Sequence, residues 1–532
     1  MRQSTRLIVN SLAVYLRMVL TVGIGLYTTR LVFRLLGDVD YGLLSVLGAG
    51  GGLLLIFSDA LVGSAQRHLA HELGRGDRQQ LRIVFSTSVI LFFAAGLTVL
   101  LVGGAISFSL VHVLAIPVER QVTCYWVFLM TLVMLAANVW GTPFRAMMTA
   151  HQSMILLSFL ELLQSVLQLA AAVLLISTPG DRLMVYALAL LVVTGITTLL
   201  SVGVCLLWYP EGRPSLGLFR WSELRSIGRV AGWGVLGGTS WRLFMQGATI
   251  ILNLAFGPLA NAAYAVALQL NGYQNSLAEP IRRTVQPVLS YLYARNEQSR
   301  LQFLVLAASK YQVILMLYVA IPIMLETEGL LTLWLGSSPP YTSAMLRWIV
   351  FGFMAFYLTN GFDMLVLATG KLAHYTLLST ATNCLYIVVP ALLFATVSVG
   401  PWAMPAAFAV ITILTAPLRA FYAGQQIGLS VRAWSRHVLA PVAAVAVVGM
   451  AAAATAHLLL EPSPHRLFVV ACAHAVAAAP ATWILALGPD EKQHFLRMWR
   501  QLIRGILPGG PDQQESQGDS SLPGRQGPAR LP

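Results

Sequence analysis

The sequence predicts an all-α polytopic membrane protein with about fourteen transmembrane helices. Of its 532 residues, 57% are hydrophobic and only 10% are charged, whereas a soluble chain carries roughly a quarter charged residues. The apolar residues form runs of about 20 to 28 residues, long enough to cross a hydrocarbon core of roughly 30 Å. Backbone groups in lipid must be hydrogen-bonded within the segment, so each run is expected to be a helix.

The predicted spans follow one another at short intervals along the chain. They lie near residues 7–33, 41–66, 83–110, 122–144, 151–177, 183–208, 229–256, 259–281, 301–325, 341–368, 373–398, 402–424, 437–460 and 465–487. The span at 259–281 is rich in Asn, Gln and Tyr. This polarity is typical of a helix that faces a water-filled cavity rather than lipid.

The basic residues predict how the chain is oriented. The net charge of +13 comes mainly from Arg and Lys between the spans, a distribution typical of cytoplasmic loops and not of a nucleic-acid-binding surface. Alternate connections are rich in bases, whereas the opposite ones are poor, apart from Arg30 and Arg34 near the first outer turn. The bias predicts a multi-pass protein of the bacterial inner membrane with both termini in the cytoplasm.

An internal repeat with an offset of 220 residues divides the chain. LLGDVDYG at 35–42 recurs in outline as LAFGPLANAAYA at 254–265, so that Gly37 matches Gly257. An offset of six spans preserves orientation, so we expect two six-helix bundles related as parallel repeats, residues 1–212 and 213–431. Two additional transmembrane helices are expected within 432–488. Residues 489–532 should form a basic amphipathic helix and a disordered cytoplasmic tail.

Polar residues within the spans are the candidate functional residues, because each costs free energy unless it faces protein or water. Asn10, Arg17 and Thr21 share one face of the first predicted helix, and Arg242, Gln246 and Asn253 share one face of its repeat partner. We interpret these two faces as the walls of a shared central cavity. The alternative is that the arginines reach the membrane interface, or pair with carboxylates for packing alone.

Four further charged residues fall within predicted spans: Asp59, Glu161, Asp363 and Lys310. All four are candidate ion-coupling residues. Each carboxylate is a candidate proton or sodium site, or else the partner of a buried Arg. The four cysteines lie in separate spans without a CxxC pair, so we expect neither a metal site nor disulfides, and no cofactor.

One motif suggests an enzyme instead. Asp38-Val39-Asp40 resembles the metal-binding DxD of glycosyltransferases, and it falls in a predicted outer loop. The outer connections are too short to hold an acceptor, and helix punctuation also explains the segment. We therefore expect a transporter rather than an enzyme.

Three segments resemble the polysaccharide and O-antigen flippases of the multidrug/oligosaccharidyl-lipid/polysaccharide exporter superfamily. They are residues 10–53, GSAQRHLAHELGRGD at 63–77 and PFRAMMTAHQSM at 143–154. The resemblance implies a MATE-like fold and alternating access. It also implies transfer of an oligosaccharide on a polyprenyl pyrophosphate carrier, an exopolysaccharide or O-antigen repeat unit, from the inner to the outer leaflet. The implied partners are this lipid-linked oligosaccharide, membrane lipids and polysaccharide polymerase or export machinery.

The resemblance gives the candidate residues specific roles. Arg17 and Arg242 would hold the pyrophosphate by charge-assisted hydrogen bonds, while Asn10, Thr21, Gln246 and Asn253 would meet sugar hydroxyls. A membrane potential or an ion gradient would drive transfer. The alternatives are a multidrug and toxin cation antiporter of the same fold, a lipid II flippase, and a membrane glycosyltransferase.

Overall fold

The computed structural model describes residues 3–55, 58–370, 373–489, 491–493 and 496, although the side chains of 3–17, 58–60, 216 and 226–236 are outside this description. Within these ranges the chain consists of helices and short connections, without a strand. The first half contains α1 (Gln3–Leu53), α2 (Ser58–Arg75), α3 (Arg78–Val113), α4 (Gln121–Ala150), α5 (Met154–Leu174) and α6 (Arg182–Trp208). The second half contains α7 (Trp221–Phe256), α8 (Pro258–Ala294), α9 (Gln298–Leu325), α10 (Thr327–Leu335), α11 (Thr342–Tyr357), α12 (Asn360–Thr369), α13 (Ala373–Thr396) and α14 (Ala403–Gly424). After these come α15 (Val431–Trp434), α16 (Ala440–Leu459) and α17 (Pro464–Ala481).

Most of these helices are suited to a membrane. In the described part of the chain, 10 helices are long and apolar enough to cross it, or up to 11 if α11 and α12 form one bent span. The multi-pass prediction is thereby confirmed. Every predicted span falls on a helix, but α7 and α8 are too polar to be among the 10. The count of fourteen crossings therefore stays a prediction, and the predicted amphipathic helix and tail lie almost wholly outside the described residues.

Two predicted spans are broken rather than continuous. In place of a helix over 41–66, α1 bends at Gly37 and ends at Leu53, and α2 begins at Ser58. The interruption follows the glycines at 50–52, whose helix propensity is low. A Cβ at Gly51 would lie 2.6 Å from Leu135 on α4, so these glycines do serve close helix packing. The span predicted over 341–368 is divided into α11 and α12, which meet at 45°.

The sequence repeat is also a repeat of backbone geometry. Gly37 has φ 77° and ψ 174°, and Gly257, 220 residues later, has φ 74° and ψ −170°. The next hairpins match as well, with φ 73° at Gly76 and 55° at Asn296. Positive φ favours Gly and is tolerated by Asn. The side of the molecule with Gly37 and Gly257 is the predicted outer side, and the side with Gly76 and Asn296 is the predicted inner side.

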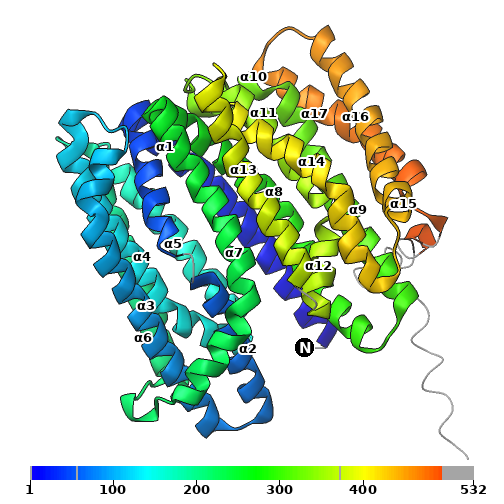
Figure 1. Ribbon diagram of the computed structural model, residues 1–532. Helices are drawn as coiled ribbons and strands as arrows, with labels where there is room; N and C mark the ends of the chain where they lie inside the picture. Colours follow the sequence, from blue (N-terminus) through cyan, green and yellow to red (C-terminus); the bar gives the residue numbers. More distant parts are fainter. Residues whose placement is uncertain (1–2, 56–57, 371–372, 490, 494–495, 497–532) are drawn as a thin grey trace, which may run out of the picture.

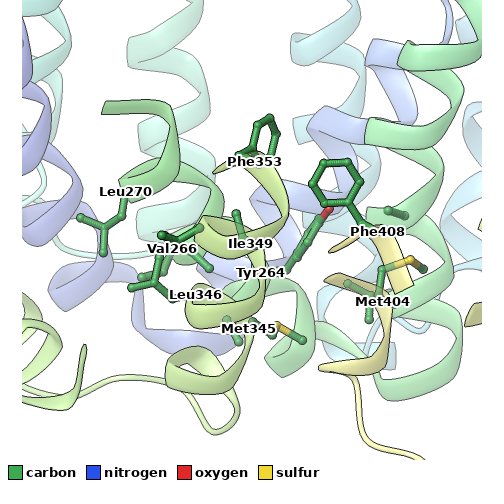
Figure 2. Packing of buried hydrophobic residues seen from close by; sticks show 14 of the residues in the cluster. Tyr264, Val266, Leu270, Met345, Leu346, Ile349, Phe353, Met404 and Phe408 are labelled. Atoms are coloured by element: carbon green, nitrogen blue, oxygen red, sulfur yellow. The ribbon is translucent and has the colours of Figure 1, made fainter. Parts of the chain in front are cut away.

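Figure 1 shows two groups of helices with the last helices beside the second group. α1 packs against α5 of the first group and also against α8 of the second, so it lies between them (Figure 1). The core of the second group is aromatic and aliphatic. Figure 2 shows Tyr264 from α8, Phe353 from α11, and Met404 and Phe408 from α14 within one buried cluster.

The last two helices are fastened to the second group at both ends. On the predicted outer side, Glu326 is 2% exposed. It lies 2.7 Å from Nδ1 of His457 on α16 and accepts a hydrogen bond of 2.9 Å from Arg466 on α17. On the predicted inner side, Lys310 of α9 pairs with Glu491 at 2.8 Å. Buried pairs of this kind are strongly destabilising to break, so α16 and α17 are expected to move together with α9.

The two halves contact each other on the predicted outer side. Trp334 of α10 donates from Nε1 to the Leu26 carbonyl of α1 at 2.9 Å. Reciprocally, Arg34 of α1 donates from Nε to the Leu335 carbonyl at the end of α10, at 3.0 Å. A Cβ at Gly42 would lie 2.0 Å from the Pro258 carbonyl oxygen. The backbones of α1 and α8 therefore approach too closely at this point for any residue other than glycine.

Candidate functional site

A polar chamber of about 480 Å³ lies between α1, α5, α6 and α8. Its lining is formed mainly by hydroxyls, amides and tyrosine rings: Thr21, Thr28, Thr29, Ser45, Ser165, Gln168, Gln269, Tyr41, Tyr186 and Tyr273. The described lining includes no Asp, Glu, Lys or Arg. Such a chamber offers hydrogen bonds and flat apolar ring faces without net charge, which is the chemistry that neutral hydroxylated ligands require.

The α1 wall of the chamber is explained by the spacing of two threonines and one glycine along that helix. Thr21 and Thr28 are seven residues apart, two turns along the same face of α1. Gly25 lies between them, and a Cβ there would be 2.4 Å from the Tyr273 hydroxyl. Glycine therefore lets the α8 tyrosine reach α1, where Gln269 donates a hydrogen bond of 2.7 Å to its hydroxyl. The Thr21 hydroxyl is buried with no hydrogen-bond partner in the described chain, so it is available to a ligand.

The predicted cavity residues are only partly brought together. Thr21 lines the chamber. Arg17 lies about one turn from it on α1 and Asn10 about three turns, towards the predicted inner side, but their side chains lie outside the description. Arg242 and Gln246 of α7 are half-buried and are not part of the chamber lining.

Asn253 was predicted to face the central cavity, but it is not part of the chamber lining. It is fully buried, and its Oδ1 accepts a hydrogen bond of 2.8 Å from the backbone N–H of Ala115. It therefore caps the connection after α3 and joins the two halves on the predicted outer side. Helical periodicity identified the polar face of α7, but this end of that face packs against protein instead of the chamber.

The charged residues predicted within spans are divided among several environments. Lys310 is buried in a pair with Glu491 and also donates to the Ala486 carbonyl at 2.8 Å. Glu161 is exposed on α5, two turns from the chamber residue Gln168. The side chain of Asp59 lies outside the description.

Asp363 belongs to a buried polar cluster in the second half. Its carboxylate accepts a hydrogen bond from the Tyr375 hydroxyl and interacts with the charge of Arg419. Arg419 is 2% exposed, and its guanidinium lies over the Phe356 ring at 5.3 Å. Within the described residues the Nε of Arg419 has no hydrogen-bond acceptor. This cluster is separate from the chamber lining.

The DxD-like segment has a structural partner. Asp40 accepts a hydrogen bond of 2.7 Å from Arg120, which also pairs with Asp181 at 2.9 Å. Burial alone would raise the pKa of Asp181, but the Thr123 hydroxyl, the Arg120 charge and backbone N–H groups outweigh it and lower that pKa. Among the described residues no group of three or more His, Cys, Asp or Glu is placed to hold a metal ion. Asp40 therefore ties α1 to the starts of α4 and α6.

An apolar groove of about 580 Å³ adjoins the chamber. It runs along the other side of α1, between α8, α9, α10 and α17, and its walls include Val22, Leu270 and Ile323. Tyr273 of α8 lines both the groove and the chamber. A polar space and an apolar space are thus in contact through one side chain.

No sequence pattern identified Tyr41, Tyr186 or Ser165 as lining residues of the chamber. A signal for two lining residues was present in the polarity of the span at 259–281, which predicted a helix facing a cavity, and its Gln269 and Tyr273 do line the chamber. Tyr41 and Tyr186 carry no such signal, because a lone tyrosine near a span end is ordinary in membrane helices.

The family profile described as "Polysaccharide biosynthesis protein" matches residues 7–293. A comparison of the sequence with curated proteins gives no match. Among solved structures, similarity extends to a multidrug resistance MATE family transporter of the MOP superfamily in an inward-facing conformation, with a TM-score of 0.64, 16% identity, and coverage of 77% of this chain and 98% of that one. The lipid II flippase MurJ in an inward closed conformation has a TM-score of 0.66 and 11% identity, covering 93% of this chain and 100% of that one.

A MOP superfamily transporter from Pyrococcus furiosus, whose binding pocket is described as having reverse polarity, has a TM-score of 0.55 and 16% identity over 79% of this chain and 93% of that one. Together these structures establish the MATE-like and MurJ-like fold. At such low identity they carry the fold alone.

Proposed function

The chain belongs to the polysaccharide biosynthesis protein family, and from this premise we propose that it is a flippase for polyprenyl-pyrophosphate-linked oligosaccharide. The observation that carries the proposal is the contact between the uncharged polar chamber and the apolar groove through Tyr273. A lipid-linked oligosaccharide has the same division, with a hydroxyl-rich glycan joined to a long hydrocarbon chain. The chamber would hold the glycan and the groove would hold the start of the chain.

The pyrophosphate needs cations, because an unpaired anion cannot be moved through hydrocarbon. Arg17 and Arg242 stay the proposed partners for it, by charge-assisted hydrogen bonds. Thr21, with its buried unpartnered hydroxyl, and Asn10 are the proposed sugar contacts. Gln246 packs against Gly52 of α1 and Asn253 holds Ala115, which gives these two a positioning role in the proposal.

Alternating access provides the mechanism. The close contacts between α1 and α10 on the predicted outer side support assignment of this structure to a state closed towards the outside. Release of these contacts would open the chamber outwards. Asp363, Glu161 and Asp59 are the proposed sites at which a proton or cation is coupled to that change. Lys310 is proposed to act through its pair with Glu491 as an anchor for the last helices.

The setting we propose is the bacterial inner membrane, with both termini in the cytoplasm and polysaccharide polymerase or export machinery as partners.

A lipid II flippase stays the second candidate, since the fold match to one extends over 93% of the chain. The described chamber lining has no carboxylate, which argues against an organic-cation antiporter. The engagement of Asp40 with Arg120 argues against a glycosyltransferase.

The test is transfer of a fluorescent polyprenyl-pyrophosphate oligosaccharide in liposomes. We expect wild-type protein to move it to the opposite leaflet, and Arg17→Ala with Arg242→Ala to abolish transfer. The matched control is Arg295→Ala with Arg300→Ala, which removes the same charge from exposed positions on the predicted inner hairpin and should retain transfer. Failure of wild type under every imposed gradient, with organic cations crossing instead, would overturn the proposal.

A further inference from the structure

Arg30 is the one described charged residue in the lining of the apolar groove. It lies on the outer half of α1, about 10 Å along the helix axis from the turn at Gly37. Within the described part of the chain, no hydrogen bond, ion pair or ring contact engages its guanidinium. Arg34, one turn further on, differs because it is committed to the Leu335 carbonyl. A cation left without an acceptor beside hydrocarbon is costly, which marks such residues as functional candidates.

A second polar group in the groove also lacks a partner. Gln274 of α8 is 2% exposed, and neither its Oε1 nor its Nε2 has a hydrogen-bond partner among the described residues. Burial of an amide with no hydrogen-bond partner is unfavourable, so an unpaired buried amide calls for an explanation. Gln274 lines the groove immediately after Tyr273, the residue that also reaches the chamber. Arg30 alone could extend towards the outer surface, but that would leave the Gln274 amide unexplained.

The two groups mark a route for a polar head group out of the chamber. Thr28 faces the chamber, and Arg30, two residues later, is about 200° further around α1 and faces the groove. Arg17 and Arg30 are thirteen residues apart, about 20 Å along the helix, which is roughly two thirds of the hydrocarbon thickness. An anion passing from the level of Arg17 to the level of Arg30 would cover most of the membrane.

We propose that Arg30 is a second anion-binding residue, which holds the pyrophosphate of the carrier lipid on the outer half of the membrane while its chain occupies the apolar groove. Gln274 would donate a hydrogen bond to the phosphate oxygens as the head group passes from chamber to groove. The inference rests on the proposed function and adds an exit site to it. The occupant we assign is a polyprenyl diphosphate, because the groove is lined mainly by apolar side chains and has a cation at one end. It also explains one of the two arginines that depart from the charge bias of the outer connections.

The experiment measures lipid binding to the full chain in phosphatidylcholine nanodiscs by native mass spectrometry. The probes are a long-chain polyprenyl diphosphate without sugar, the polyprenyl alcohol of the same length, and phosphatidylglycerol as competitor. Wild type should prefer the diphosphate to the alcohol. Arg30→Gln should lose that preference by roughly tenfold or more, the fold-change for one charge-assisted hydrogen bond. Arg30→Lys should restore part of it, and Gln274→Leu should reduce it.

The control is Arg300→Gln, the same charge change at an exposed position on the predicted inner hairpin, which should leave binding unchanged. Restoration by Arg30→Lys distinguishes loss of the cation from misfolding, and the melting temperature of each variant is measured alongside. Equal binding by wild type and Arg30→Gln would overturn the exit site, as would equal competition by phosphatidylglycerol. Either result, with glycolipid transfer by wild type intact, would leave the proposed function standing. Absence of both diphosphate binding and transfer would remove the proposed function itself.

Discussion

The buried pair of Lys310 and Glu491 tests how the last two helices are held. Both side chains are 8% exposed, and Nζ of Lys310 lies 2.8 Å from each carboxylate oxygen and 2.8 Å from the Ala486 carbonyl oxygen. Glu491→Leu would leave a buried ammonium with one carbonyl, which typically costs about 3–5 kcal/mol of unfolding free energy. Lys310→Met should cost less, because Glu491 still accepts the Gly488 N–H at 2.7 Å.

The double variant separates ion pairing from simple loss of packing. Lys310→Met with Glu491→Leu leaves neither charge unpaired, so its cost should fall below the sum of the single costs by at least about 1 kcal/mol. The measurement is reversible unfolding in mixed micelles. The control cycle uses the exposed pair Arg300 and Glu297, also at 2.8 Å, whose coupling should be about 0–1 kcal/mol. Additive costs for Lys310 and Glu491 would refute the reasoning.

The same pair predicts a pH dependence. Burial alone would raise the pKa of Glu491, but hydrogen bonds from Lys310, the Gly488 N–H and Tyr311 outweigh it and lower that pKa below the ordinary 4.5. A lowered folded-state pKa means that the contribution is complete above the unfolded value and is lost as pH falls through the folded value. The stability difference between wild type and Glu491→Leu should therefore be constant near neutrality and shrink below pH 4.5.

Three further predictions follow from the turns and the contacts on the predicted outer side. Trp334→Phe removes the hydrogen bond to the Leu26 carbonyl and should favour the outward-open state by about 0.5–1.5 kcal/mol. Distances between spin labels on the outer ends of α1 and α10 would show this shift. An unchanged distance distribution would contradict the proposed role of the contacts between α1 and α10. Gly257→Ala forces a Cβ onto a residue at φ 74° and ψ −170°, a region used almost only by glycine, and should lower unfolding free energy by about 1–3 kcal/mol, whereas Gly238→Ala, with open space and no such φ, should not. Arg120→Gln removes the partner of Asp40 and Asp181 and should lower the melting temperature. Because the pKa of Asp181 is lowered in the fold, the difference in melting temperature between wild type and variant should diminish as pH falls below the ordinary 3.8. An equal difference at every pH would exclude an ionic cause.

Much of the fold could be predicted because a membrane-spanning helix is recognisable from its own continuous run of apolar residues. Each apolar run must hydrogen-bond within itself, so helices are found where hydrophobic residues are continuous. The repeat was detectable because Gly37 and Gly257 require the same positive φ, a demand that few residues satisfy. Breaks were less predictable: the second span ends early after a glycine run, and helix propensity at such a run is only a weak guide.

The sequence by itself determined the all-helical membrane class, and it predicted two related halves and a set of polar helix faces. The tertiary structure decided what each face meets. Asn253 and Ala115 are 138 residues apart, Lys310 and Glu491 are 181 apart, and Tyr273 comes between two cavities because Gly25 of α1 leaves room for it. Helical periodicity fixes the direction of a side chain relative to its own axis. Its partner depends on how helices distant in sequence pack together, and no local pattern contains that information.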